Sequence, residues 1–258
     1  PEDLPVLVIG PKRVAERSWP KEIAKWRPDL SYAVAAGTPK KRQEAFERNA
    51  DITTVGFSNL ADAPASYKTV VVDEASGIKN KSTKRWKEVR RLTKPADNRW
   101  LLSGTPAGNS LMDLWAQYAV LDEGERLETS LTRFRTRYFY PAVTLPNGIV
   151  AKWALKPGSE EAIHKAIADI TFSEAPAIEV PHIIHDIEVT LPPKVRKVYN
   201  EFEREAIAEF KSTEIVALQP ATLTNKLGQV SSGFIYDEDG GTTWLHEAKL
   251  DVLREIVD

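Results

Sequence analysis

The sequence of 258 residues contains no cysteine, which excludes disulfides, thiolate zinc sites and cysteine nucleophiles. The same absence fits a reducing compartment, so we expect an intracellular protein of the cytoplasm or nucleus. No apolar run approaches the ~20 residues that a membrane span needs, and we expect no membrane partner. The N-terminus, PEDLPVLVIG, lacks the basic segment with which a signal peptide begins.

An excess of charge of one sign is also missing. Lys and Arg number 35 against 37 Asp and Glu, which leaves a formal net charge of −2. A protein that binds polyanions with its whole surface carries a large positive excess, so nucleic-acid contacts should come from local patches. Basic residues dominate one such patch, from Lys79 to Arg99. Its alternative interpretation is a solvated helix face.

The first half of the sequence alternates short β-branched runs with helical patterns. Strands are predicted at 5–9, 31–36, 51–57, 68–73 and 99–103. Helices are predicted near 20–27, 39–49 and 82–93, the last with Ser82 as its N-cap. The runs VLVI and VVV are continuously apolar, as in strands that are buried on both faces of a parallel sheet. The pattern predicts a doubly wound α/β domain with a mostly parallel sheet.

The second half is mainly helical by pattern. Helices are predicted at 110–121, 130–138, 159–170, 193–211 and 246–257, with one strand at 182–190. YDEDGGTTW (236–244) predicts a Gly-Gly turn between two strands rather than a calcium loop. The change of pattern falls in the Pro/Gly-rich stretch 141–158, so we expect one domain over 1–140 and a helical extension over 141–258.

The strongest local signal is YKTVVVDEASGIKN (67–80), in which an apolar strand leads to two adjacent carboxylates, Asp73 and Glu74. Ligands of open α/β sheets bind at the carboxyl ends of the strands. One carboxylate would help to hold Mg²⁺, which prefers oxygen ligands, and the next would orient an attacking water in nucleotide hydrolysis. The alternative is that Asp-Glu simply ends a strand.

A second strand, in RWLLSGTPAGNSLMDLW (99–115), ends in the small hydroxyl-rich segment Ser103-Gly104-Thr105. Hydroxyl groups at a neighbouring strand end can hydrogen-bond to the carboxylate site and report its state elsewhere. The alternative is an ordinary strand–turn–helix in which glycine and proline form the turn. The order and spacing of the two segments favour the nucleotide site over both alternatives.

Together these segments resemble the Swi/Snf family of helicase superfamily two, which are DNA-dependent ATPases. PVLVIGPKRVAERSW with KEIAKW is similar to motif Ia, VVVDEASGIKN to the DEAH-box motif II, and LLSGTPAGN with LMDLW to motif III. ITTVGFSNL, VTLPPKVRKVYNEF, LGQVSSGFIYD and EAKLDVLREIV resemble further family segments along the chain. The resemblance implies the first RecA-like lobe of such an ATPase, followed by a mainly helical, family-specific extension.

Residue roles follow from the resemblance, position by position. Asp73 would be the Mg²⁺-associated carboxylate and Glu74 the residue that activates water, with ATP as the nucleotide. The residues that would couple the nucleotide state to the track are Ser76, Ser103, Gly104 and Thr105. The residues that would lie near nucleic acid are Pro11, Lys12, Arg13, Ser58, Asn59, Lys79 and Asn80.

The sequence departs from the family pattern in two respects. Ser76 stands where the DEAH box has histidine, so a hydroxyl must supply any coupling made there by the imidazole. No G-x-x-x-x-G-K-[ST] occurs, so the amide cradle and lysine that hold the β- and γ-phosphates are missing. In the family this motif lies upstream of Pro1, and a second RecA-like lobe with its arginines would follow Asp258.

These features predict part of an ATP-driven motor that moves along or remodels double-stranded DNA. We expect the second lobe in cis as a partner, and we expect the 258 residues alone to be inactive. The rival hypothesis is a catalytically silent, ATP-independent module that binds nucleic acid or protein and has lost its phosphate-binding loop. RNA in place of DNA also stays open at this stage.

Overall fold

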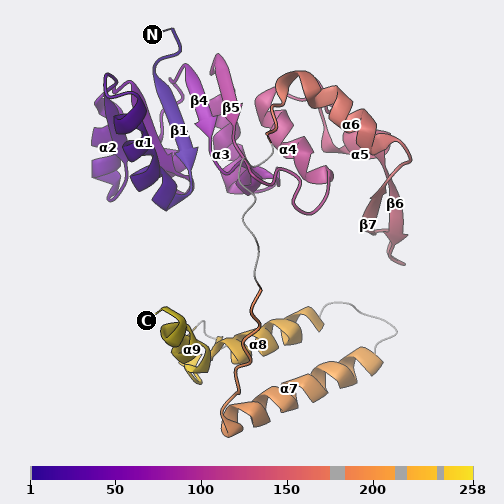
Figure 1. Cartoon of the computed structure of the whole chain (residues 1–258). Coiled ribbons are helices and arrows are strands. Elements are labelled where there is room, and N and C mark those ends of the chain that lie inside the picture. Colours follow the sequence, from indigo (N-terminus) through magenta and orange to yellow (C-terminus); the bar gives the residue numbers. More distant parts are fainter. Residues whose placement is uncertain (1, 175–183, 213–219, 237–240, 258) are drawn as a thin grey trace. The chain divides into compact units, whose positions relative to one another are not determined.

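The computed structural model describes residues 2–174, 184–212, 220–236 and 241–257 (Figure 1). The chain divides into two compact units, Pro1–Ala175 and Pro176–Asp258, which are considered separately below. The expected boundary between 140 and 141 falls inside the first unit, and the assignment of 1–140 as the ATPase lobe stays a prediction.

The first unit is built on a five-stranded parallel sheet in the order β2-β3-β1-β4-β5. Its strands are β1 (Val6–Gly10), β2 (Tyr32–Ala35), β3 (Ile52–Gly56), β4 (Thr69–Val72) and β5 (Asn98–Leu101). Every neighbouring pair is parallel. The structure therefore confirms the predicted α/β class and each of the five predicted strands to within a few residues.

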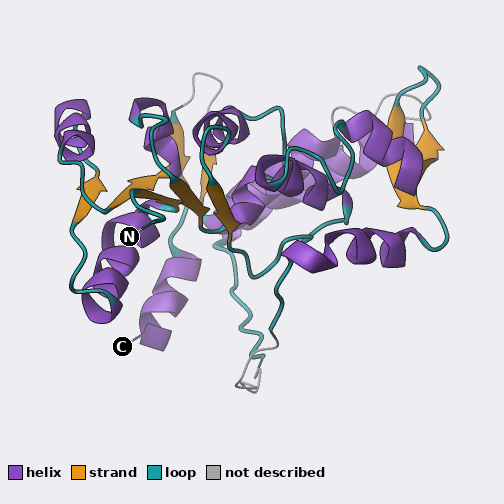
Figure 2. Cartoon of the chain, turned by 90° about the horizontal axis from the view of Figure 1, so that it is seen from above, coloured by secondary structure: helices purple, strands orange, loops and turns teal. Residues whose placement is uncertain are grey.

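Three helices connect these strands: α1 (Trp19–Trp26), α2 (Pro39–Glu47) and α3 (Lys84–Thr93). Short helical turns, η1 (Val14–Ser18), η2 (Phe57–Asp62) and η3 (Ala75–Ile78), follow the ends of β1, β3 and β4. Helices lie on both sides of the sheet (Figure 2). The N-cap of α3 is Thr83 and not the predicted Ser82, because the Thr83 hydroxyl accepts from the amide of Trp86 while Ser82 bonds to Asn80.

Alternation along the strands divides the side chains between the two faces. Leu7 and Val70 point to one face and form a fully buried core with Phe46 of α2 and Leu92 of α3. On the other face the Thr54 hydroxyl donates to the carbonyl of Ala15 in η1 at 2.8 Å. This hydrogen bond attaches η1, which is part of the segment that resembles motif Ia, to β3.

The remainder of the first unit packs around a second apolar cluster. Its elements are α4 (Met112–Leu121), α5 (Leu131–Tyr138), β6 (Phe139–Thr144), β7 (Val150–Leu155), α6 (Ser159–Ile167) and η4 (Ala168–Ile170). Phe134 and Ile163 are fully buried there, beside Trp115 of α4. The Pro/Gly-rich stretch 141–158, in which the pattern of the sequence changes, consequently contains most of an antiparallel hairpin and the turn that leads into α6.

The second unit contains α7 (Pro193–Ser212), α8 (Pro220–Ser232), β8 (Phe234–Tyr236), β9 (Thr242–Trp244) and α9 (Ala248–Val257). The prediction of two strands around the Gly-Gly segment is confirmed by β8 and β9, although residues 237–240 lie outside the described ranges. The predicted strand at 182–190 is wrong for 184–190, which form no regular structure, and 182–183 are not described. None of the helices in the described ranges is long and apolar enough to cross a bilayer.

Candidate functional site

The two predicted motif segments meet at the carboxyl edge of the sheet. β4 pairs with β5 in register, so that Val72 lies beside Leu101, and the next residues of each strand emerge together. The amide of Leu102 donates to the carbonyl of Val72, and the amide of Ala75 donates back to the carbonyl of Leu102. Asp73 and Ser103 therefore follow adjacent strands at the same edge, as the sequence predicts.

Asp73 is held by hydrogen bonds on both of its carboxylate oxygens. Trp19 Nε1 donates to Oδ2 at 2.9 Å from the start of α1, and the amide of Glu74 donates to Oδ1 at 2.9 Å. Gly10 ends the neighbouring strand, and a Cβ placed there would lie 3.4 Å from Asp73 Cβ. The carboxylate is half-buried and fixed in direction, with acceptor capacity remaining on each oxygen.

Glu74 differs from Asp73 in both exposure and backbone conformation. Its φ of 54° and ψ of 54° place a non-glycine residue in the left-handed region, which costs of order 1 kcal/mol or more and is frequent at functional sites. This turn ends β4 and starts η3, where the amide of Gly77 donates to the carbonyl of Glu74 at 2.9 Å. The Glu74 side chain is exposed at the carboxyl edge of the sheet.

The predicted coupling residues lie on both sides of these carboxylates. Ser76 is half-buried in η3, and Ser103 Oγ accepts from the amide of Thr105 at 3.2 Å. Gly104 and Thr105 are exposed and continue the loop toward α4. The turn formed by Ser103 keeps its hydroxyl at the strand end, next to the backbone hydrogen bond from Ala75 to Leu102.

Two of the predicted nucleic-acid loops adjoin each other. A Cβ placed on Gly56, at the end of β3, would lie 3.5 Å from the Cα of Lys12. Lys12 and Arg13 are exposed after β1, and Ser58 is exposed after β3. Pro11 and Asn59 are half-buried beside them. These five residues therefore lie at the same edge of the sheet as Asp73.

The remaining two predicted contact residues make local interactions. Lys79 Nζ lies 3.6 Å from Oδ2 of Asp113 in α4, and Asn80 Oδ1 accepts from both the amide and the hydroxyl of Ser82. Lys79 thus links the end of motif II to the helix that follows motif III, whereas Asn80 stabilises the turn that leads into α3. Within the described residues, no group of three metal-ligating side chains comes together.

A profile of the SNF2-related domain matches residues 2–230 of the chain. The chain belongs to this family. Protein p41 of Acyrthosiphon pisum secondary endosymbiont phage 1 is 32% identical over 275 residues, a match that covers 100% of this chain and 60% of p41. The ISWI chromatin-remodeling complex ATPase ISW1 of Saccharomyces cerevisiae is 30% identical over 122 residues, which cover 43% of this chain and 10% of ISW1.

Among solved structures, the SWI2/SNF2 ATPase core of Sulfolobus solfataricus, determined in complex with double-stranded DNA, superimposes with a TM-score of 0.55. The match has 23% sequence identity and covers 99% of this chain and 53% of that core. This likeness shows the fold, and it confirms the RecA-like α/β architecture expected from the sequence. The SNF2-related chain thus spans little more than half the length of that core and 60% of p41.

Two side chains of this SNF2-related site were not predicted. Trp19 stands 54 residues from Asp73, and only the folded sheet brings its indole to the carboxylate. Gln117 is buried in α4, and its Nε2 donates to the carbonyls of Pro106 at 2.6 Å and Asp113 at 3.0 Å. A glutamine within the apolar run LWAQYAVL is the sequence signal that would have drawn attention to the second contact.

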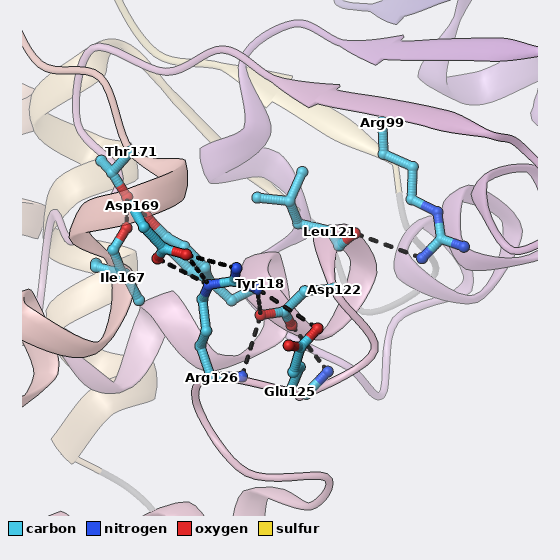
Figure 3. A network of polar contacts seen from close by, with 10 residues as sticks. Arg99, Tyr118, Leu121, Asp122, Glu125, Arg126, Ile167, Asp169 and Thr171 are labelled. Carbon is cyan, nitrogen blue, oxygen red and sulfur yellow. Dashed lines mark hydrogen bonds and ion pairs between the residues drawn. The ribbon is translucent and has the colours of Figure 1, made fainter.

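The loop after motif III is also supported from the chain that leaves α6. Tyr118 shares a 2.7 Å hydrogen bond with Thr171, and burial raises the pKa of the Tyr118 hydroxyl. Arg126 joins Asp122 to Asp169 through charged hydrogen bonds (Figure 3). The hydrogen bond from Arg126 holds the pKa of Asp169 below its usual range. Segment 169–171 is consequently attached to α4, the helix that follows motif III in the sequence.

Proposed function

We propose that this chain carries the motif II carboxylates of a DNA-stimulated ATPase, and that it acts within an ATP-driven motor on double-stranded DNA. The observation that carries the proposal is the paired register of β4 and β5, which brings Asp73–Glu74 and Ser103 to one sheet edge. The membership in the SNF2-related family supports the same assignment.

The residues at this edge fit a magnesium–nucleotide complex. Asp73 offers fixed carboxylate oxygens, which are the ligands that Mg²⁺ prefers, and Trp19 holds them in one direction. Bound Mg²⁺–ATP would supply the reactive phosphoryl group and part of its charge neutralisation. Asp73 is the residue that would hold this group, and the exposed Glu74 carboxylate would accept the proton of the attacking water.

The coupling residues Ser103, Gly104 and Thr105 would connect ATP hydrolysis at the carboxylates to movement on DNA. The strand ends that carry Glu74 and Ser103 are joined by the backbone hydrogen bond from Ala75 to Leu102, and the loop after Ser103 is attached to α4 by the bond from Gln117 to Pro106. A backbone shift at the carboxylates would reach α4 along this segment. Lys12 and Arg13 extend from the same sheet edge, where they would contact phosphates without reading base sequence.

We further propose that the 258 residues do not hydrolyse ATP by themselves. No Gly-Lys pair occurs in the sequence, so the backbone amides and lysine that cradle the β- and γ-phosphates have no counterpart here. An arginine at the transferring phosphoryl group contributes ~10³–10⁵ to the rate in related systems, and the family resemblance assigns that arginine to a second lobe. The absence of the phosphate-binding loop also sustains the rival function, an ATP-independent binding module.

The test compares this chain with a protein that joins it to the phosphate-binding loop and second lobe of an SNF2-family relative, called the joined protein below. Phosphate release is measured for both, with and without duplex DNA. The proposal expects DNA-stimulated release by the joined protein only. Robust hydrolysis by the 258 residues would show that the missing loop is not required. A joined protein that binds nucleotide without hydrolysing it would favour the rival.

A further inference from the structure

β6 and β7 form a two-stranded ribbon that pairs with no other strand in the described chain. It stands at the end of the first unit away from the parallel sheet (Figure 1). Its turn is Pro146-Asn147-Gly148, in which Gly148 has a φ of 79°. The amide of Leu145 donates to the carbonyl of Ile149, and the amide of Gly148 donates back to the carbonyl of Leu145. This turn fixes the register of the ribbon.

The base of the ribbon is firmly attached. Phe139 is buried in the second apolar cluster, and Trp153 and Leu155 pack against that cluster. The guanidinium of Arg135 lies 5.5 Å from the Trp153 ring centroid. The ribbon therefore projects from a packed base on α5, and its direction is set by that base.

The outer part of the ribbon, from 140 to 149, is exposed at every residue. Its larger apolar side chains are Tyr140, Val143, Leu145 and Ile149, and Ile149 is 60% exposed. An isolated two-stranded hairpin is only marginally stable in water. Because these apolar side chains are exposed, they contribute little to the free energy of folding. A cluster of exposed apolar side chains on a projecting element indicates a contact surface.

The segment of sequence that contains the ribbon carries charge of one sign. Residues 129–159 contain no Asp or Glu, and their cations are Arg133, Arg135, Arg137, Lys152 and Lys156. The whole chain, by contrast, has a formal net charge of −2. Arg137 pairs with Glu128, and Lys156 donates to the carbonyl of Thr136. Arg133 and Lys152 are exposed and have no ion-pair partner among the described residues.

We propose that the ribbon is an additional contact with double-stranded DNA, with its apolar tip in the major groove and Arg133 and Lys152 at the flanking phosphates. The inference rests on the proposed function only in taking duplex DNA as the partner. The major groove of B-form DNA, ~12 Å wide, admits a two-stranded β-ribbon. Exposed cations without an ion-pair partner, Arg133 and Lys152, suit a polyanion, whereas a second copy of this ribbon would meet it with charge of the same sign.

The experiment measures the binding of this 258-residue chain to a fluorescent DNA duplex by anisotropy over a range of salt concentrations. The first variant is Arg133→Ala with Lys152→Ala, and the second is Leu145→Ser with Ile149→Ser. The matched control is Lys68→Ala with Lys94→Ala, which removes two exposed cations from the opposite, amino edge of the sheet. Thermal unfolding followed by circular dichroism verifies that each variant keeps the fold.

We expect the Arg133/Lys152 variant to bind about tenfold more weakly at low salt, with a slope of log affinity against log salt shallower by about 1–2. The Leu145/Ile149 variant should bind DNA several-fold more weakly and leave double-stranded RNA unaffected, because the A-form major groove is too narrow to enter. The Lys68/Lys94 control should bind as the wild type does.

Three results would overturn the inference. Unchanged DNA affinity in both ribbon variants, with weaker binding by Lys12→Ala/Arg13→Ala, would remove the ribbon contact and leave the proposed function standing. Unchanged affinity in all of these variants would contradict both the ribbon contact and the proposed binding of DNA. Self-association of the wild type that the Leu145/Ile149 variant abolishes, measured by sedimentation, would assign the ribbon to a second copy of the chain instead of DNA.

Discussion

Trp19 donates its indole hydrogen to Oδ2 of Asp73 at 2.9 Å, across 54 residues of sequence. The π-helical turn η1, which lies between Pro11 and Trp19, sets where the indole points. Turns of this kind are rare and often occur at functional sites. Motif Ia and motif II are thus joined by a direct bond, and Trp19 is a positioning residue for the carboxylate.

Replacing Trp19 by phenylalanine tests this bond. Trp19→Phe keeps the ring packing and removes a charge-assisted hydrogen bond, whose loss costs about 1.5–3 kcal/mol. If this hydrogen bond stabilises the transition state for hydrolysis, DNA-stimulated turnover of the joined protein falls about tenfold or more. The affinity for nucleotide without Mg²⁺ should change little, since the bond acts on the carboxylate.

The matched control for this change is Trp26→Phe. Trp26 Nε1 bonds to Glu22 on the surface of the same helix, so the same substitution breaks an exposed bond of similar length, 2.8 Å. Turnover within twofold of wild type is expected for the control. Equal losses for the two variants would assign the effect to the stability of α1 and not to Asp73.

Lys12 and Arg13 provide a test of the phosphate contacts. Lys12→Ala with Arg13→Ala should weaken binding to all duplex sequences alike and make the salt dependence shallower by about one unit of slope for each lost contact. The measurement is a salt titration of duplex affinity for two unrelated sequences. Affinity that is unchanged between low and high salt in the wild type would contradict a phosphate-based interface.

Replacing Gln117 tests how much its hydrogen bond to Pro106, in the segment of motif III, stabilises the fold. Gln117→Met keeps the volume in the core and leaves the carbonyl of Pro106 without its donor, which should lower the free energy of unfolding by about 1–2 kcal/mol. Urea denaturation measures this change. Gln43→Met on the exposed surface of α2 is the control, with an expected effect within about 0.5 kcal/mol. Equal effects would mean that the buried bonds of Gln117 contribute nothing.

The Arg126–Asp169 pair predicts a pH-dependent contribution to stability. The folded pKa of Asp169 is lowered by the hydrogen bond from Arg126, so the folded chain binds fewer protons there than the unfolded chain. Its stabilising effect is therefore complete above the unfolded pKa and is lost as the pH falls through the folded one. Asp169→Asn should lower Tm at neutral pH, and the difference should shrink as the pH falls below the ordinary Asp pKa of ~3.9 and through the lower folded pKa.

Asp97→Asn is the control for this titration. Asp97 is exposed and has no ion pair among the described residues, so the same substitution should leave Tm nearly unchanged at every pH. A Tm difference for Asp169→Asn that stays constant from neutral to acid pH would show that the effect comes from packing and not from the ion pair.

The sheet and its two motif segments could be predicted because their signals are local. The run Val70–Val72 is too apolar for an exposed strand, and the polar residue that follows it, Asp73, has to stand at the strand end. The apolar run Trp100–Leu102 places Ser103 at the end of the next strand in the same way, although β5 is the edge strand and Trp100 is 61% exposed. Parallel pairing then brings both to one edge, and the structure agrees.

The rest depended on contacts between distant residues. Nothing near Trp19 in the sequence indicates that its indole meets Asp73. The β6–β7 hairpin was missed because the Pro/Gly content of 141–158 suggested a boundary between two regions, although Pro146-Asn147-Gly148 is a turn sequence that strands commonly flank. The alternation that suggested a strand at 182–190 is interrupted by Ile184, and Ile184–Thr190 find no partner strand in the described residues.

The most direct test of the central claim is the turnover of Glu74→Gln in the joined protein with duplex DNA present. The change keeps the size of the side chain and removes its basicity, and a general base contributes ~10²–10⁴ to the rate. Phosphate release should therefore fall by at least about a hundredfold, with nucleotide affinity unchanged within a few-fold. Glu44→Gln, on exposed α2, should hydrolyse ATP as the wild type does. Hydrolysis by Glu74→Gln at the wild-type rate would contradict the assignment of this edge of the sheet as the catalytic site.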